Sequence, residues 1–229
     1  MRILDKIQRR LLRMRLCPIR VFSFHQVSDI FDETTMYRND WMQTEMFKSA
    51  IANLRDEGYI FISLQEAYEK LKHDAFRFRK YAVLTSDDGW ASLRNILPWL
   101  NEQQIPITLF LNPAYLDGKH FRERKTEKYL TETEVLQLQD QYPFLTIGSH
   151  GFEHKDVYKM SKEEFEDSLL RTEQVLSSYP NYVPFYAFAW GRYTKDAYAI
   201  VQHYNLVPVL MDGQKNYFNQ QKIHRELLQ

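Results

Sequence analysis

Short apolar runs alternate with amphipathic stretches along most of this chain. Seven of the runs are rich in β-branched and aromatic residues and have the length of strands. They cover residues 20–24, 59–62, 81–85, 107–111, 145–148, 186–188 and 207–210. The pattern therefore predicts seven strands separated by stretches long enough for helices.

The stretches between these runs carry helix signals. Residues 131–134 and 161–164 have the sequence of a capping box, and Thr194 is placed as an N-cap. An apolar stripe with helical spacing over residues 47–54 stops before Gly58. Strands that alternate with helices indicate a mostly parallel sheet with helices outside. This pattern leaves open whether the sheet is open or closed into a barrel.

The composition is that of an ordinary soluble protein. The chain has 229 residues, of which 44% are hydrophobic and 26% charged, enough for one sizeable domain. Its 30 Lys and Arg residues are balanced by 30 Asp and Glu residues, which argues against nucleic acid as the main partner. The single cysteine, Cys17, excludes an intrachain disulfide and a cysteine metal cluster.

Residues 1–19 form a basic segment ahead of the domain that we assign to residues 20–229. Its arginines interrupt the apolar positions, so it lacks the apolar core of a secretory signal. We expect a cytoplasmic protein. The segment can form an amphipathic helix, and two interpretations stay open: packing on the domain, which we favour, or peripheral contact with an anionic membrane.

Polar residues follow most of the predicted strands. In parallel α/β folds the carboxyl ends of the strands meet at one face, where active sites gather. We therefore expect residues that are distant in sequence to meet there. They are His25, Asp87, Asp88, His150, His154, Trp190, Arg192 and Asp212.

Two of these groups predict a metal site. Asp87 and Asp88 are adjacent at the end of a buried strand, where two carboxylates repel each other unless a cation lies between or beside them. His150 and His154 are four residues apart and can converge on one ion. Two imidazoles and one carboxylate leave a position for water, as in catalytic zinc sites. Either aspartate can supply the carboxylate, and the other is then available as a base.

The sequence also resembles the polysaccharide deacetylases, or carbohydrate esterase family four. Thr-Ser-Asp-Asp-Gly at residues 85–89 resembles the first motif of that family, Thr-Phe-Asp-Asp-Gly, and His-Gly-Phe-Glu-His at residues 150–154 resembles the second, His-Ser/Thr-x-x-His. Further similarity covers residues 24–27, 58–64 and 105–110, so the resemblance spans about residues 20–225. It implies a distorted (β/α) barrel of about seven units.

The resemblance also implies roles for individual residues. Asp88, His150 and His154 would bind a divalent metal, and Asp87 would be the general base. His224 matches the position of the histidine that protonates the leaving amine. A backbone N–H near Trp190 would hold the oxyanion.

Several positions depart from the family motifs. Ser86 replaces a phenylalanine, and Gly151 replaces a serine or threonine. The third motif, Arg-Pro-Pro-Tyr-Gly, supplies an arginine that orients the base, but residues 186–191 contain none. Arg192 is the candidate substitute, and Asp212 is the remnant of the fourth motif.

These observations predict a metal-dependent N-deacetylase for an amino sugar of a bacterial cell-surface polysaccharide or its precursor. Zinc is the expected metal, and cobalt, nickel or manganese would also suit the ligand set. His25 and Trp190 are candidate substrate contacts. Two alternatives remain: a metal-binding homologue that binds glycan without turnover, and a hydrolase of a different small amide.

Overall fold

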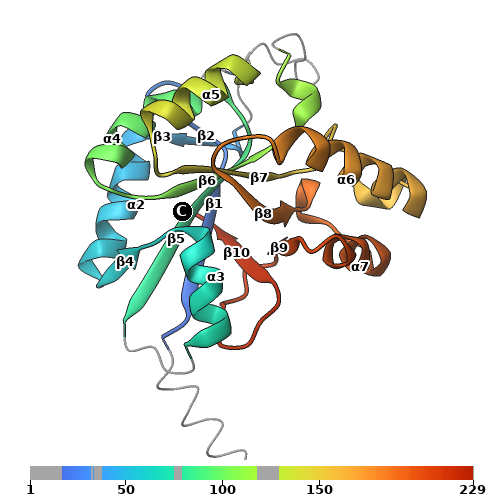
Figure 1. Ribbon diagram of the computed structural model, residues 1–229. Helices are drawn as coiled ribbons and strands as arrows, with labels where there is room; N and C mark the ends of the chain where they lie inside the picture. The colour runs from blue at the N-terminus through green and yellow to red at the C-terminus, as the bar shows by residue number, and fades with distance from the viewer. Residues whose placement is uncertain (1–16, 32, 34–37, 75–78, 118–128, 229) are drawn as a thin grey trace, which may run out of the picture.

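The computed structural model describes residues 17–31, 33, 38–74, 79–117 and 129–228 (Figure 1). The basic segment predicted for residues 1–19 lies almost wholly outside the described residues, and Ile19 is already the first residue of a strand. Among the described helices, none is long and apolar enough to cross a membrane.

Seven parallel strands close into a ring. Their order around it is β1, β10, β9, β8, β7, β6 and β5, and pairing of β5 with β1 closes the ring. The strands are β1 (Ile19–Phe24), β5 (Lys80–Asp88), β6 (Ile107–Leu111), β7 (Leu145–Ser149), β8 (Tyr182–Ala187), β9 (Val207–Met211) and β10 (Ile223–Leu227). The predicted barrel is therefore confirmed.

Three short strands lie outside the ring. β4 (Tyr59–Phe61) pairs with the first residues of β5. β2 (Gln26–Ser28) and β3 (Trp41–Gln43) pair with each other in a separate parallel sheet.

Helices surround the barrel, as Figure 1 shows. They are α2 (Thr44–Asp56), α3 (Leu64–His73), α4 (Leu97–Glu102), α5 (Glu132–Gln141), α6 (Lys162–Leu176) and α7 (Lys195–His203). Both predicted capping boxes are present, at the starts of α5 and α6, and Thr194 caps α7. The predicted stripe over residues 47–54 is the buried face of α2.

The period-two alternation of the strands separates an interior core from two outer clusters. Val83, Val209 and Ile223 belong to an interior cluster, together with residues of α3, which covers the end of the barrel where the strands begin. Their strand neighbours face outward: Leu84 packs in the cluster under α2, α4 and α5, and Leu210 packs in the cluster under α6 and α7.

The sequence predicted the number of barrel strands and the identity of six of the seven. The predicted strand over residues 59–62 is β4, which lies outside the ring, and β10 takes the seventh place. β10 contains His224, Arg225 and Glu226, whose charged and polar side chains interrupt the apolar pattern on which the prediction rests. Each of the three has a partner elsewhere in the fold: Asp212, Asp87 and Arg20 respectively.

We expect Gly148→Ala to destabilise the barrel. A Cβ at Gly148 would lie 2.6 Å from Cε1 of the buried Phe110 ring and 3.1 Å from the carbonyl oxygen of Phe185. Overpacking of this kind costs about 1–3 kcal/mol, which urea unfolding of the metal-free protein would measure. Because alanine is otherwise favoured over glycine inside a strand, an equal or higher stability would contradict this packing.

Candidate active site

Asp87 and Asp88 end β5 at the face where the barrel strands finish. Both are buried, with 5% and 2% of their surface exposed. Asp87 lines a cavity of about 230 Å³, together with His25, His150, His154 and other residues. Asp88 has a φ of 72° and Gly89 a φ of 81°, so the chain turns sharply after the strand. This turn lets two adjacent carboxylates meet different partners.

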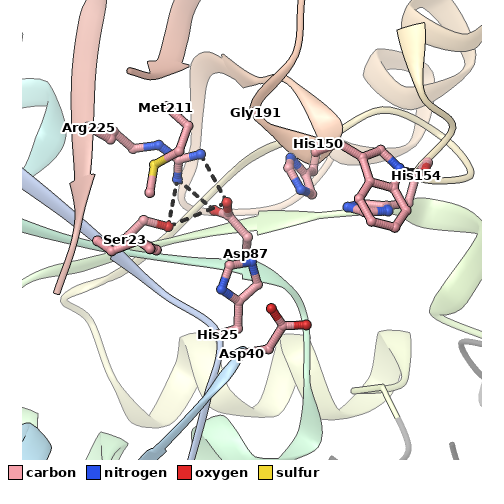
Figure 2. A pocket seen from close by; sticks show the side chains of 11 residues that line it. Ser23, His25, Asp40, Asp87, His150, His154, Gly191, Met211 and Arg225 are labelled. Carbon is pink, nitrogen blue, oxygen red and sulfur yellow. Dashed lines mark hydrogen bonds and ion pairs between the residues drawn. The ribbon is translucent and has the colours of Figure 1, made fainter. Parts of the chain in front are cut away.

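Asp87 is held by Arg225, which is not among the site residues predicted from the sequence. Arg225 Nη1 donates to Asp87 Oδ1 at 2.6 Å, and Nη2 donates to Oδ2 at 2.9 Å (Figure 2). Arg225 is only 1% exposed, and its Nη1 also contacts the hydroxyls of Ser23 and Thr85. A bidentate pair of this kind fixes the orientation of the carboxylate.

The surroundings of Asp87 keep it ionised. Burial alone would raise the pKa of Asp87, but the Arg225 guanidinium, with contributions from His150 and His25, holds that pKa below its ordinary value. The side chain is therefore a carboxylate at neutral pH, the form that can accept a proton.

Asp88, His150 and His154 converge on one point. Asp88 Oδ1 lies 3.4 Å from His150 Nε2 and 3.1 Å from His154 Nε2. One ligand atom from each residue lies within 4.8 Å of the other two. Two imidazole nitrogens and one carboxylate oxygen suit zinc, so the residues present fit the divalent metal that the sequence predicts.

The atoms behind these three ligands also fit a metal site. His150 Nδ1 lies 2.8 Å from the carbonyl oxygen of Ala187, which directs Nε2 toward the site. The Trp90 indole N–H donates to Asp88 Oδ2 at 3.0 Å, leaving Oδ1 directed at the imidazoles. Gly151, where the family has a hydroxyl residue, has a φ of 80°, and a Cβ there would lie 3.1 Å from the Tyr186 hydroxyl.

The buried charges shift each other's pKa values. Burial disfavours ionised Asp88, but the pKa of Asp88 is held well below its ordinary value by His154 and His150. Burial also disfavours charged His150, but Asp87 and Asp88 raise its pKa. A metal cation would replace a proton in this cluster, so its binding would release protons.

Two further predicted residues lie at the cavity. His25 follows β1 and lines the same cavity as Asp87. Trp190 lies at its mouth with 51% of its surface exposed and a φ of 61°, an uncommon conformation for a bulky residue. The Trp190 indole N–H donates to the carbonyl oxygen of His154 at 3.2 Å.

Three other predicted residues do not line this cavity. Arg192 forms an ion pair with Asp156 at 2.9 Å instead of contacting Asp87. His224 packs on the outward face of β10, because its neighbour Arg225 faces the interior. His224 Nδ1 contacts the Asp212 carboxylate at 2.8 Å, outside the cavity. Arg225 thus makes the contact with Asp87 that was expected of Arg192, and the proton-donor role of His224 stays a prediction.

A weak signal for Arg225 was present in the sequence. Ile223, Arg225 and Leu227 share one face of a strand if residues 223–227 alternate with period two. An arginine between two apolar residues on one face must find a buried acidic partner or reach water. Nothing in the local pattern identifies that partner as Asp87, which is 138 residues away.

A closed parallel barrel with charged groups at the carboxyl ends of its strands is the arrangement of (β/α)-barrel enzymes. The sequence profile described as "Polysaccharide deacetylase" matches residues 77–209, more than half of the chain. The chain belongs to this family. No curated protein sequence matches the chain.

Solved structures share the fold at low sequence identity. The Streptococcus pyogenes deacetylase PplD, in complex with acetate, superposes with a TM-score of 0.77 at 19% identity, covering 92% of each chain. IcaB from Ammonifex degensii gives 0.75 at 17% identity, covering 93% of this chain and 92% of that one. The de-N-acetylase from Aggregatibacter actinomycetemcomitans gives 0.72 at 18% identity, covering 92% and 94%.

We expect Arg225→Gln to destabilise the metal-free protein in a pH-dependent way. Without the guanidinium, Asp87 is a buried carboxylate lacking its cation, at a cost of about 3–5 kcal/mol at neutral pH. In the wild type the lowered pKa of Asp87 stabilises the fold above about pH 4. In the variant burial raises the pKa of Asp87. As the pH falls from 7, the folded variant therefore takes up a proton on Asp87 at a higher pH than the unfolded chain does. The difference in unfolding free energy between the wild type and Arg225→Gln should therefore become smaller from pH 7 toward pH 4, as denaturant titrations would measure.

Arg20→Gln is the matched control for this prediction. Arg20 pairs with Glu226 across β1 and β10, but both side chains are about a quarter exposed. Its removal should cost about 1 kcal/mol or less. Equal losses of unfolding free energy in Arg225→Gln and Arg20→Gln would show that the buried Arg225–Asp87 pair stabilises the fold no more than a partly exposed pair does.

Proposed function

We propose that this protein is a metal-dependent hydrolase that removes N-acetyl groups from an amino sugar of a bacterial cell-surface polysaccharide or its precursor. One observation carries the proposal: an ionised, arginine-paired Asp87 lines the same cavity as His150 and His154, which converge with Asp88 on one point. Family membership supplies the saccharide substrate class. The cytoplasmic location stays the prediction made from the sequence.

Asp88, His150 and His154 would hold the metal. When bound, a divalent ion of this kind polarises the acetamide carbonyl and lowers the pKa of a water molecule, to about 7 on zinc. Asp87 lies beside this cluster without being one of its three ligands, so it accepts the proton of the attacking water. Arg225 orients Asp87 and keeps it ionised until that transfer.

His25 is the group that we assign as proton donor to the leaving amine. It is among the residues that line the cavity, whereas His224 is not. His25 follows β1, which pairs with β5, so the acid and the base come from the ends of neighbouring strands.

The cavity size and the exposed tryptophan fit a saccharide. A volume of about 230 Å³ is below the range of about 300–1,000 Å³ typical of small-molecule sites. The cavity therefore admits an acetamido group with part of its sugar, and the rest of a chain lies outside. The exposed Trp190 ring at the mouth is placed to stack on a neighbouring sugar.

The alternative of a glycan-binding homologue without turnover rested on the missing arginine of the third motif. The contact between Arg225 and Asp87 supplies an arginine from β10 in its place. This contact favours the enzyme over the binding protein.

We expect Asp87→Asn to lower acetate release by about two orders of magnitude or more while metal binding persists. Loss of a general base lowers kcat by about 10²–10⁴-fold, whereas Asp88, His150 and His154 remain. The assay measures acetate released from N-acetylated sugars, oligosaccharides and non-sugar amides. It uses protein stripped by a chelator and then re-supplied with zinc or cobalt.

Asp167→Asn, an exposed aspartate on α6, is the control and should retain full activity. Acetate release that persists without metal, or in Asp87→Asn, would contradict the mechanism. Release from simple amides but from no saccharide would instead support a different substrate class.

A further inference from the structure

Asp88 and His154 are joined through a column of three aromatic rings. The column consists of Trp90, Tyr129 and Tyr115, and none of these residues is a metal ligand in the proposed site. It begins at Asp88, whose Oδ2 accepts the Trp90 indole N–H at 3.0 Å. Trp90 is fully buried and follows the turn at Asp88 and Gly89, which brings the indole back onto the carboxylate.

Tyr129 forms the middle of the column. Its ring stacks on Trp90 with centroids 4.5 Å apart and an interplanar angle of 28°. The backbones of Trp90 and Tyr129 also form an antiparallel bridge, and Leu130 N–H donates to the carbonyl oxygen of Gly89 at 2.8 Å. The turn that carries Asp88 is therefore fixed by both ring stacking and backbone hydrogen bonds.

Tyr115 forms the far end of the column. It stacks on Tyr129 with centroids 4.6 Å apart and an interplanar angle of 18°. The Tyr115 hydroxyl donates to the carbonyl oxygen of Glu153 at 2.8 Å. Glu153 directly precedes His154, which has a φ of 53°, a conformation that a non-glycine residue adopts only where its surroundings hold it.

We propose that Tyr129 is a positioning residue for the metal site, acting through Trp90 on Asp88 and through Tyr115 on His154. Asp88 and His154 come from different strand ends, and their separation decides whether one ion can reach both. The column holds this separation before the metal arrives, so the ligands need less ordering when it binds. This inference rests on the metal site of the proposed function.

The test is metal affinity, measured by competition with a chromophoric chelator. Removal of groups that orient metal ligands typically costs about 10–100-fold in affinity, so we expect the zinc Kd of Tyr129→Leu to rise by about tenfold or more. Tyr129→Phe keeps both ring faces and should bind as the wild type does. In the cobalt-loaded protein, the visible absorption bands should change in Tyr129→Leu and be restored in Tyr129→Phe.

Tyr179→Leu is the control for a merely structural loss. Tyr179 is a buried tyrosine of the outer core, 4% exposed, and outside the column. The Tyr179→Leu substitution should lower thermal stability and leave the zinc Kd unchanged. Wild-type affinity in Tyr129→Leu, or equal weakening in Tyr179→Leu, would overturn the inference.

Two conservative variants keep the test decisive if Tyr129→Leu does not fold. Trp90→Phe removes the hydrogen bond to Asp88 and keeps an aromatic ring, though a smaller one, in the column. Tyr115→Phe removes the hydrogen bond to Glu153 and keeps the phenyl ring. Each of these substitutions should raise the zinc Kd, and a Kd that stays at the wild-type value in either variant would overturn the inference. If the wild-type protein binds no metal, the proposed function is contradicted. If the wild type binds metal and the variants bind it equally well, only the role of the column is contradicted.

Discussion

The site depends on the burial of two adjacent carboxylates at the end of β5. An ionised carboxylate in a protein interior is costly unless cations and hydrogen-bond donors surround it. Asp87 is compensated by Arg225, and Asp88 by His150, His154 and the Trp90 indole. The fold must therefore deliver groups from distant parts of the chain to one point.

Closure of the barrel brings these distant groups together. Strands of one sense end at one face, so the residue after β7 and the last residues of β5 meet there. Alternation along β10 turns Arg225 inward and its neighbour His224 outward, toward Asp212. A shift of one residue in β10 would exchange the two side chains and leave Asp87 without its arginine. Strand register is thus as important to the site as the identity of the residues.

Residues of the site also explain the departures from the family motifs. Gly151 lies where the backbone has a positive φ and the Tyr186 hydroxyl is close. The arginine absent from residues 186–191 has its counterpart on β10, the strand beside β1. The same bidentate contact can be supplied from another strand because every barrel strand ends at the same face.

The sequence by itself indicated a parallel α/β fold and the helix starts, and its resemblance to a known family indicated the barrel and the grouping of Asp88, His150 and His154. These features depend on local periodicity, capping residues and short motifs, which are all visible within a few residues. Only the tertiary structure decided that β10 completes the ring, that Arg225 pairs with Asp87, and that His224 contacts Asp212. The physical reason is that each depends on which face of a strand meets which distant partner. A charged strand such as β10 becomes recognisable only when the partners of its charges are in place.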